Sequence, residues 1–316
     1  EEQGCLKGSV AFEQALVSFF AKMDGLYKSD VIYHNAAHAA DVTATTEWLM
    51  QSQYMKARTT QLDHFMSLVA SLIHDVGHPG RNNLFHTKTM SPLAVRYNDK
   101  AILEQMHVSL AFETMQSSPE SDWFNKLARV VPAKAFEATS LAPAGAADFQ
   151  LQQYTRRGLI AMVLATDMAK HGTHVQELKG LAQEPETADT QKALERKLFL
   201  LETVVHAADI SNPCKPRDVM MSWTRRVLQE FWRQGDEEVR LGLEVSPLCD
   251  RADGCMTVPE GQIGFISFVV QPFFEPIAAL IDEVKEATQQ LEQNKAFWKG
   301  KDEEKVTYDQ IFVGVA

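Results

Sequence analysis

Apolar residues recur along most of this chain with the three-and-four spacing that places them on one face of an α-helix. The pattern is clearest over residues 62–73, 198–208 and 221–234. Runs in which polar and apolar residues alternate between hairpin turns, as strands require, are missing from the sequence. The periodicity therefore predicts an all-α protein.

Three breaks interrupt the helical pattern. Residues 132–149 are rich in Ala, Pro and Gly, and similar breaks lie near 182–190 and from about 244 to 261, so we expect surface loops there. None is long or polar enough to demand a domain boundary, and no internal repeat is visible. We expect residues 1–316 to form a single multi-helix domain.

One stretch imitates a membrane span. Residues 263–281 are nearly continuous in apolar side chains, but Gln271, Pro272, Glu275 and Pro276 interrupt them. A helix exposed to lipid tolerates that combination poorly. We therefore expect a buried core helix here and no membrane span.

The formal charge, 31 − 42 = −11, argues against nucleic acid or an anionic membrane surface as the main partner. A small anionic substrate is not excluded, because metal ions can dominate a local electrostatic field.

The cysteines Cys5, Cys214, Cys249 and Cys255 form no C-x-x-C pair and no disulfide framework, which favours a reducing, cytoplasmic setting. The chain begins Glu-Glu-Gln without Met or a signal-like stretch, so we expect a fragment whose regulatory or targeting regions lie outside it.

Four residues far apart in the sequence form a candidate ligand set for a divalent metal: His38, His74, Asp75 and Asp209. They lie in the segments Y-H-N-A-A-H-A-A-D-V, H-D-V-G-H-P-G-R-N-N and H-A-A-D-I-S-N-P. Imidazole nitrogen with carboxylate oxygen suits zinc and leaves room for a harder ion such as magnesium.

The local sequence places these ligands at helix ends. His74 and Asp75 precede the breakers of the V-G-H-P-G run, Asp209 precedes S-N-P, and Asn35 is a candidate N-cap for a helix that carries His38. The spacing of four between His34 and His38, and again between His74 and His78, predicts a shared helix face for each pair. Each residue alone could be an ordinary polar group at a helix terminus, but about half of the 10 histidines fall within two short segments.

These segments resemble the signature motifs of the class I cyclic-nucleotide phosphodiesterase catalytic domain. The resemblance covers roughly residues 31–280 in the order of the family and continues through S-P-L-A-V-R-Y-N-D, L-E-Q-M-H, A-T-D-M-A-K-H, F-W-R-Q-G-D and G-Q-I-G-F-I. The A-T-D-M-A-K-H-G run and the segment at 244–261 suggest a protozoan, kinetoplastid-type member. The resemblance implies a compact HD-type helical domain with a metal site at the base of a deep pocket.

The resemblance also implies catalytic roles. His38, His74, Asp75 and Asp209 would hold zinc, and Asp75 would bridge to a second ion, magnesium or manganese. A hydroxide between the two metals would attack the cyclic phosphate while His34 protonates the departing 3′ oxygen.

Residues around these ligands receive supporting roles by the same resemblance. His78, Glu104 and Thr166 would orient metal-bound waters, and Glu104 would help to keep His34 protonated. The family usually has an acidic residue in place of Gly77, so the surroundings of this segment are expected to differ.

The same resemblance implies a substrate pocket. Gln262 would bind the purine edge through its amide, Phe265 and Val227 would clamp the ring, and Asn212 would add a contact. Without the resemblance, core packing would be the preferred interpretation of Phe265 and Val227.

The function expected is metal-dependent hydrolysis of 3′,5′-cyclic nucleotides, cyclic AMP or cyclic GMP, to nucleoside 5′-monophosphates. One alternative is another HD-type metal phosphohydrolase, and a second is a catalytically silent module that binds cyclic nucleotide. Only about 30 residues precede Tyr33, so the N-terminal helical part is short or trimmed compared with the family. Homodimer formation is left open.

Overall fold

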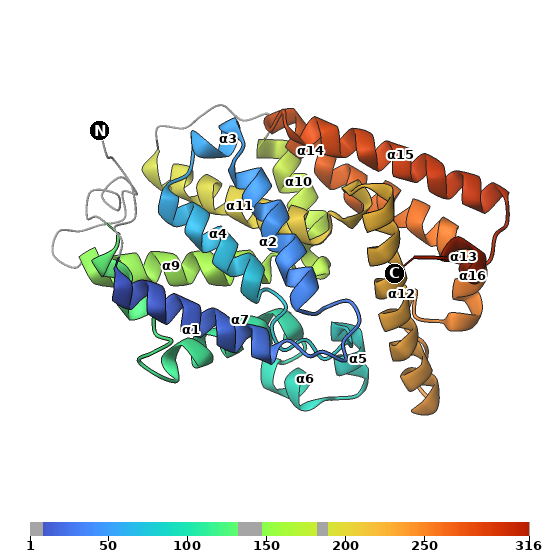
Figure 1. Cartoon of the computed structure of the whole chain (residues 1–316), viewed down its shortest axis with the longest axis horizontal. Coiled ribbons are helices and arrows are strands. Elements are labelled where there is room, and N and C mark those ends of the chain that lie inside the picture. Colours follow the sequence, from blue (N-terminus) through green and yellow to red (C-terminus); the bar gives the residue numbers. More distant parts are fainter. Residues whose placement is uncertain (1–8, 132–146, 182–188, 316) are drawn as a thin grey trace.

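The computed structural model describes residues 9–131, 147–181 and 189–315, with the backbone alone at 147–149, 190 and 252–257. These residues contain helices and no strand, as the periodicity predicted (Figure 1). The α-helices are α1 Val10–Leu26, α2 Ala36–Met50, α3 Gln53–Lys56, α4 Gln61–Ile73, α5 Asn83–Lys88, α6 Pro92–Tyr97, α7 Ile102–Gln116, α9 Ala147–Leu164, α10 His171–Leu181, α11 Thr190–Asp209, α12 Arg217–Arg240, α13 Arg251–Phe265, α14 Gln271–Leu280, α15 Val284–Glu303 and α16 Tyr308–Ile311. Shorter helical segments are η1 Phe124–Arg129, η2 Met168–Lys170, η3 Asn212–Cys214 and the π-helical η4 Ile266–Val270.

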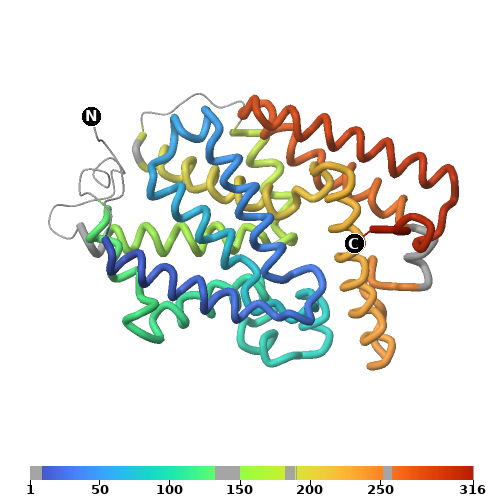
Figure 2. The backbone as a smooth tube through the Cα atoms, viewed as in Figure 1, coloured from blue at the N-terminus to red at the C-terminus, as the bar shows by residue number. Residues whose placement is uncertain are grey.

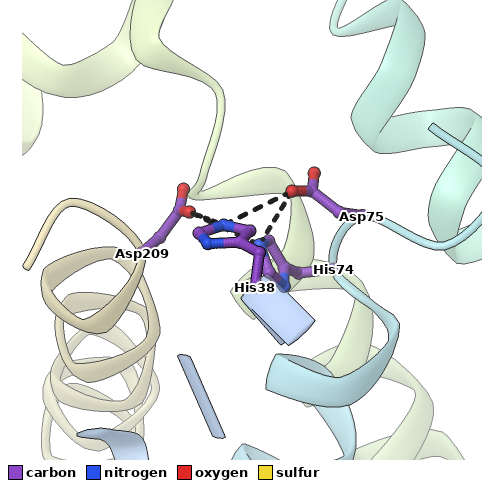
Figure 3. A group of neighbouring side chains, drawn as sticks. All are labelled: His38, His74, Asp75 and Asp209. Atoms are coloured by element: carbon purple, nitrogen blue, oxygen red, sulfur yellow. Dashed lines mark hydrogen bonds and ion pairs between the residues drawn. The ribbon is translucent and has the colours of Figure 1, made fainter. Parts of the chain in front are cut away.

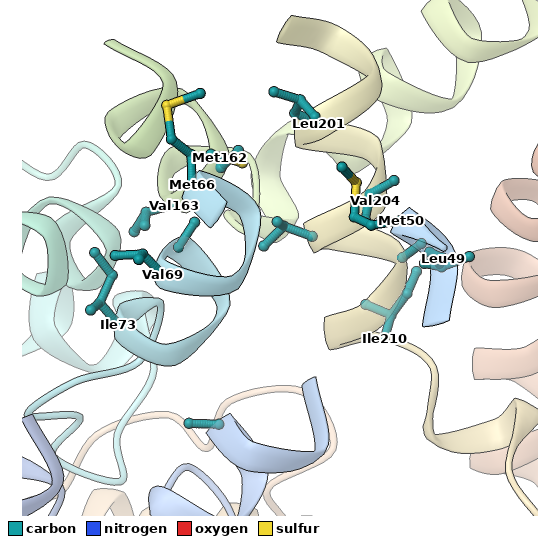
Figure 4. Packing of buried hydrophobic residues seen from close by; sticks show 14 of the residues in the cluster. Leu49, Met50, Met66, Val69, Ile73, Met162, Val163, Leu201, Val204 and Ile210 are labelled. Atoms are coloured by element: carbon teal, nitrogen blue, oxygen red, sulfur yellow. The ribbon is translucent and has the colours of Figure 1, made fainter. Parts of the chain in front are cut away.

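The centre of the molecule is built by α2, α4, α9 and α11, which pack against one another. Their contact faces carry the apolar residues that the spacing singled out, including Met66 and Val69 of α4 and Leu201 and Val204 of α11 (Figure 4). All four side chains are buried. Since α2, α4 and α11 also have the candidate metal ligands at their ends, the packed core fixes where those ligands lie.

The later helices, from α12 onward, gather at one end of the molecule (Figure 2). The chain then folds back on α12, where the ring of Tyr308 lies 4.7 Å from that of Trp232 and Arg225 donates a hydrogen bond to the carbonyl of Val315. The C-terminal segment thus supports the outer side of α12.

The three helical stretches predicted from periodicity, 62–73, 198–208 and 221–234, lie in α4, α11 and α12. The predicted loops at 132–149 and 182–190 fall largely outside the described residues. The third predicted loop is wrong beyond Asp250, because α13 begins at Arg251 and continues through Pro259. Packing of α13 against α12 and α15 outweighs the low helix propensity of its glycines and proline.

The apolar run predicted to be a core helix forms η4 and α14 and continues the helical path of α13. One face is buried, with Ile266, Val270, Phe273 and Phe274 each at most 1% exposed, whereas Phe268 on the other face is 81% exposed. Within the described chain, Val258–Leu280 is one helical stretch long and apolar enough to cross a membrane. About 33% of its most apolar window is buried in the protein, and that part packs into the hydrophobic core.

Candidate metal centre and substrate pocket

The four candidate ligands lie at the ends of three central helices. His38 is in the first turn of α2, whose N-cap Asn35 accepts hydrogen bonds from the backbone amides of Ala37 and His38 at 3.0 and 3.3 Å. His74 is the C-cap of α4, and Asp209 is the last residue of α11. The N-cap and both helix ends agree with the sequence prediction.

The ligand atoms of these residues converge on one point (Figure 3). His38 Nε2 lies 3.0 Å from Asp209 Oδ1, and His74 Nε2 lies 3.1 Å from Asp75 Oδ2 and 3.4 Å from Asp209 Oδ1. All four ligand atoms fall within 4.8 Å of one another. His74 Nδ1 donates to the carbonyl of Ser71 at 2.8 Å, which leaves the Nε2 lone pair free to bind a metal.

The surroundings of this cluster fit a cation. His38 and His74 are fully buried, and His74 Nε2 and Asp75 Oδ2 have no hydrogen-bond partner among the described residues. Burial alone would lower the pKa of His74, but the charges and hydrogen bonds of Asp75 and Asp209 together outweigh burial and raise that pKa well above its ordinary value. Two buried imidazoles facing two carboxylates form the donor set expected for a divalent metal.

His34 is held by Glu230, a residue that the sequence analysis missed. His34 Nδ1 lies 2.5 Å from Glu230 Oε1, and Glu230 Oε2 accepts from the backbone amides of Tyr33 and His34 at 2.7 and 3.2 Å. Burial lowers the pKa of His34, yet the negative charge of Glu230 raises it, and the net result is a pKa of about 9. A glutamate within the apolar stripe of α12 was the signal that could have found this partner.

Glu104, predicted to keep His34 protonated, has a different partner. Its carboxylate accepts from Asn83 Nδ2 at 3.0 and 3.2 Å. Burial raises the pKa of Glu104 to about 7. The partner assigned to His34 was therefore wrong, because Glu230 occupies that position, whereas the role of Glu104 in orienting water stays a prediction.

The spacing argument for shared helix faces was also wrong. His34 precedes α2, and His78 lies in the turn after α4, so neither is on a helix with its partner. Their rings instead stack on each other with centroids 4.0 Å apart. His78 Nδ1 accepts from the amide of Gly80 at 3.0 Å, and Thr166 is buried with its hydroxyl donating to the carbonyl of Val163 at 2.8 Å.

A cavity of about 520 Å³ opens beside the cluster. Asp209 and His34 line it, and so do the four residues predicted to bind substrate, Gln262, Phe265, Val227 and Asn212. Tertiary packing thus brings together side chains from α11, η3, α12 and α13.

Two of the polar side chains that line this cavity, Asn212 and Gln262, form hydrogen bonds within the protein. Asn212 Nδ2 donates to the hydroxyl of Tyr33, while Asn212 Oδ1 has no hydrogen-bond partner among the described residues. Gln262 Oε1 accepts from Thr224 Oγ1 at 3.5 Å. Val227 and Phe265 are half-buried at the cavity wall, and Phe265 also packs against the hydrophobic core, so their role in substrate binding stays a prediction.

Gly77, where the family usually has an acidic residue, adopts the left-handed conformation with φ +76°. A Cβ atom there would lie 2.7 Å from Leu110 Cδ2. Both the backbone and the space therefore favour glycine in the turn that carries Asp75 and His78.

Comparison with known proteins agrees with this geometry. A family model described as 3′,5′-cyclic nucleotide phosphodiesterase matches residues 33–291. Probable 3′,5′-cyclic-AMP phosphodiesterase pde-4 of Caenorhabditis elegans is 33% identical over 294 residues, which are 92% of this chain and 40% of that protein. The 3′,5′-cyclic-AMP phosphodiesterase 4C of Mus musculus is 33% identical over 306 residues, 95% of this chain and 41% of that protein. The chain thus spans about two fifths of the length of these relatives.

Solved structures are similar as well. The Leishmania protein LmjPDEB1 in complex with IBMX has a TM-score of 0.77 and 33% identity, covering 92% of this chain and 81% of that one. The phosphodiesterase domain of Salpingoeca rosetta rhodopsin phosphodiesterase has a TM-score of 0.78 and 27% identity, covering 92% and 82%. The Leishmania neighbour agrees with the predicted protozoan type. Its sequence identity to this chain, 33%, equals that of the nematode and mouse relatives. The chain belongs to the class I 3′,5′-cyclic nucleotide phosphodiesterases, a family of hydrolases that depend on divalent metals.

Proposed function

We propose that this chain hydrolyses 3′,5′-cyclic nucleotides to nucleoside 5′-monophosphates. The observation that carries the proposal is one cavity that contains both kinds of group the reaction needs. Asp209 and His34 line it on the side of the metal cluster, and Gln262 and Phe265 provide an amide and an aromatic face for a base. A catalytically silent module would be free to lose ligands, but all four are present.

We further propose a binuclear centre with zinc at His38, His74, Asp75 and Asp209 and with magnesium or manganese sharing Asp75. The two oxygens of Asp75 have different neighbours: Oδ2 lies 3.1 Å from His74 Nε2, whereas Oδ1 lies 3.6 Å from His107 Nε2. This division supports a carboxylate shared between two cations. When bound, such a pair supplies an activated water and neutralises charge on the phosphate.

The proton for the leaving group comes from His34 in this proposal. Because Glu230 is bonded to Nδ1, His34 presents Nε2 to the substrate. The negative charge of Glu230 raises the pKa of His34 and so favours the protonated imidazole that a general acid requires. Glu230 orients the ring through its other contacts, the amides of Tyr33 and His34.

The base end of the substrate is assigned to Gln262, Phe265, Val227 and Asn212. With Oε1 of Gln262 accepting from Thr224, its amide NH₂ is left to donate to an acceptor on the purine edge. Adenine and guanine both offer such acceptors. The relatives are named for cyclic AMP, so cyclic AMP is the first substrate that we propose to test, beside cyclic GMP.

Hydrolysis of both nucleotides by the purified protein tests the proposal. We expect 5′-monophosphate product, loss of activity after chelation, and recovery with added zinc and magnesium or manganese. Nucleoside triphosphate should be left intact. Its cleavage would instead indicate another HD-type phosphohydrolase. Binding of cyclic nucleotide without turnover in metal-loaded protein would instead identify the silent module.

A further inference from the structure

Residues 245–250, here called the rim loop, border the substrate cavity between α12 and α13. Side chains lining that cavity include Val245, Pro247 and Leu248. The loop leads directly into α13, which carries Gln262 and Phe265. The position of the rim loop therefore affects both the cavity wall and the start of the helix assigned to base recognition.

One residue of the turn in this loop, Leu248, has a backbone conformation that a leucine side chain does not favour. The carbonyl of Ser246 accepts from the amide of Cys249 at 3.0 Å, with Pro247 and Leu248 between them. Leu248 has φ +67°, the left-handed value that glycine or asparagine normally takes at the third position of a type II turn. A leucine persists in that region only where surrounding contacts hold the backbone in place.

Those contacts come from a buried carboxylate on α12. Glu238 is fully buried; its Oε2 accepts from the amide of Ser246 at 2.7 Å and its Oε1 from the Ser246 hydroxyl at 2.5 Å. Lys88 of α5 donates to the same hydroxyl at 3.1 Å and to the carbonyl of Glu244 at 2.7 Å. Its ammonium lies 3.8 Å from Glu238 Oε1, so the buried charge is compensated.

The other end of the turn is fixed by close packing. A Cβ atom on Gly235 of α12 would lie 1.9 Å from the carbonyl oxygen of Cys249. Only glycine permits this approach, so the backbone of the rim loop rests directly on α12. Two of the loop's residues, Ser246 and Cys249, are thus anchored, and Leu248 between them faces the cavity.

We propose that Ser246 is a positioning residue for substrate binding: through Glu238 and Lys88 it holds the rim loop against α12 and thereby sets the affinity for the nucleotide. The proposal rests on the proposed function, because it takes a cyclic nucleotide as the ligand. It assigns Ser246 no contact with the reacting phosphate. Loss of the Ser246 hydroxyl therefore weakens nucleotide binding and leaves the rate of the chemical step unchanged.

The test compares Ser246→Ala and Lys88→Met with the parent protein. We expect each to raise the dissociation constant for cyclic AMP about three- to tenfold, measured by calorimetry on chelated protein, since a buried charged group loses a partner. In metal-loaded protein, KM should rise by a similar factor while kcat stays within about twofold of the parent value. Ser246→Thr keeps the hydroxyl and should retain affinity close to the parent's.

The matched control is Tyr154→Phe, which removes the hydrogen bond from a buried hydroxyl to the carboxylate of Asp63, between α9 and α4. It should lower the melting temperature without changing nucleotide affinity. Equal weakening in Tyr154→Phe, or parent-like affinity in both Ser246→Ala and Lys88→Met, would overturn the proposal. If Ser246→Ala does not fold, Lys88→Met decides, because the Lys88 side chain is partly exposed. A metal-loaded parent protein that binds nucleotide without hydrolysing it would contradict the proposed function alone, since the affinity comparison needs no turnover.

Discussion

The protonation of His34 and of Glu230 depends on a contact between residues that are far apart in the sequence. Burial by itself would favour a neutral His34, yet the adjacent carboxylate of Glu230 raises the pKa of His34, which is about 9 with all neighbouring carboxylates included. The charges of Asp75 and Asp209 contribute in the same direction, but a bound cation would balance them. Glu230 lies outside the four-residue metal cluster, so its effect on His34 is expected to persist in the metal-loaded protein.

Glu230→Gln should move the alkaline limb of the pH profile of kcat/KM to lower pH. The sign follows from the charge: without the carboxylate the pKa of His34 falls, so the protonated acid is lost earlier as pH rises. A pH-rate profile from pH 6 to 10 measures this shift. Glu47→Gln, which alters the separate pair of Glu47 with His64, should leave the profile unchanged. An unaltered alkaline limb in Glu230→Gln would contradict the assignment of His34 as the acid.

Replacement of a metal ligand and of the acid should have different signatures. His38→Ala or Asp209→Ala should abolish turnover and lower bound zinc, because each removes a direct ligand. His34→Ala should keep the metal and lower kcat by about 10²- to 10⁴-fold, the range for loss of a general acid. Metal analysis beside kinetics separates the two, and His64→Ala is the control histidine. Full metal content and full rate in Asp209→Ala would refute the ligand set.

At the scale of secondary-structure elements, the ends of α2, α4 and α11 decide where the ligands lie. The Asn35 cap fixes the start of α2 one turn before His38, and the turn after α4 places Asp75 beside His74 and His78 against His34. Gly77 enables that turn, because its φ is positive and an added Cβ would lie 2.7 Å from Leu110 Cδ2, which would have to shift.

Gly77→Ala should destabilise the protein by about 1–3 kcal/mol, since alanine would carry both left-handed strain and a clash with Leu110. Chemical denaturation measures the change. Gly172→Ala in α10 is the matched control, because no atom lies within 4 Å of its added Cβ and alanine favours a helix by about 0.5–1 kcal/mol. Equal stability of Gly77→Ala and the parent would show that the turn adapts.

At the scale of the whole molecule, the metal cluster joins three central helices that are far apart in the sequence. Asp209 Oδ1 approaches the Nε2 atoms of both His38 and His74, so α11 meets α2 and α4 at this point. A cation bound there would cross-link the core. Its binding energy would add to the free energy of unfolding, because the unfolded chain has no preformed site.

Chelation should therefore lower the melting temperature, and addition of zinc should restore it. Differential scanning calorimetry in the presence and absence of chelator measures the shift. Asp209→Ala should melt at the same temperature under both conditions, which provides the control. If chelator left the melting temperature of the parent protein unchanged, a bound metal that contributes to stability would be excluded.

Local patterns accounted for much of the site. The helix ends at His74 and Asp209 and the Asn35 cap follow from residues within a few positions of one another. The substrate residues Gln262 and Phe265 came only from the resemblance, and the cavity brings them to the metal cluster. The shared-face argument for His34 failed, because the spacing of four has meaning only inside a continuous helix.

The sequence by itself determined the helical class and the chemical types of the metal ligands, since periodicity and side-chain donors are local properties. Only the tertiary structure decided that Glu230, 196 positions away, would be the partner of His34. It likewise decided that Glu238 would hold Ser246 and that α13 would be helical through Pro259. The physical reason is that these outcomes depend on which helix faces meet in the packed core, and no short stretch of sequence specifies that.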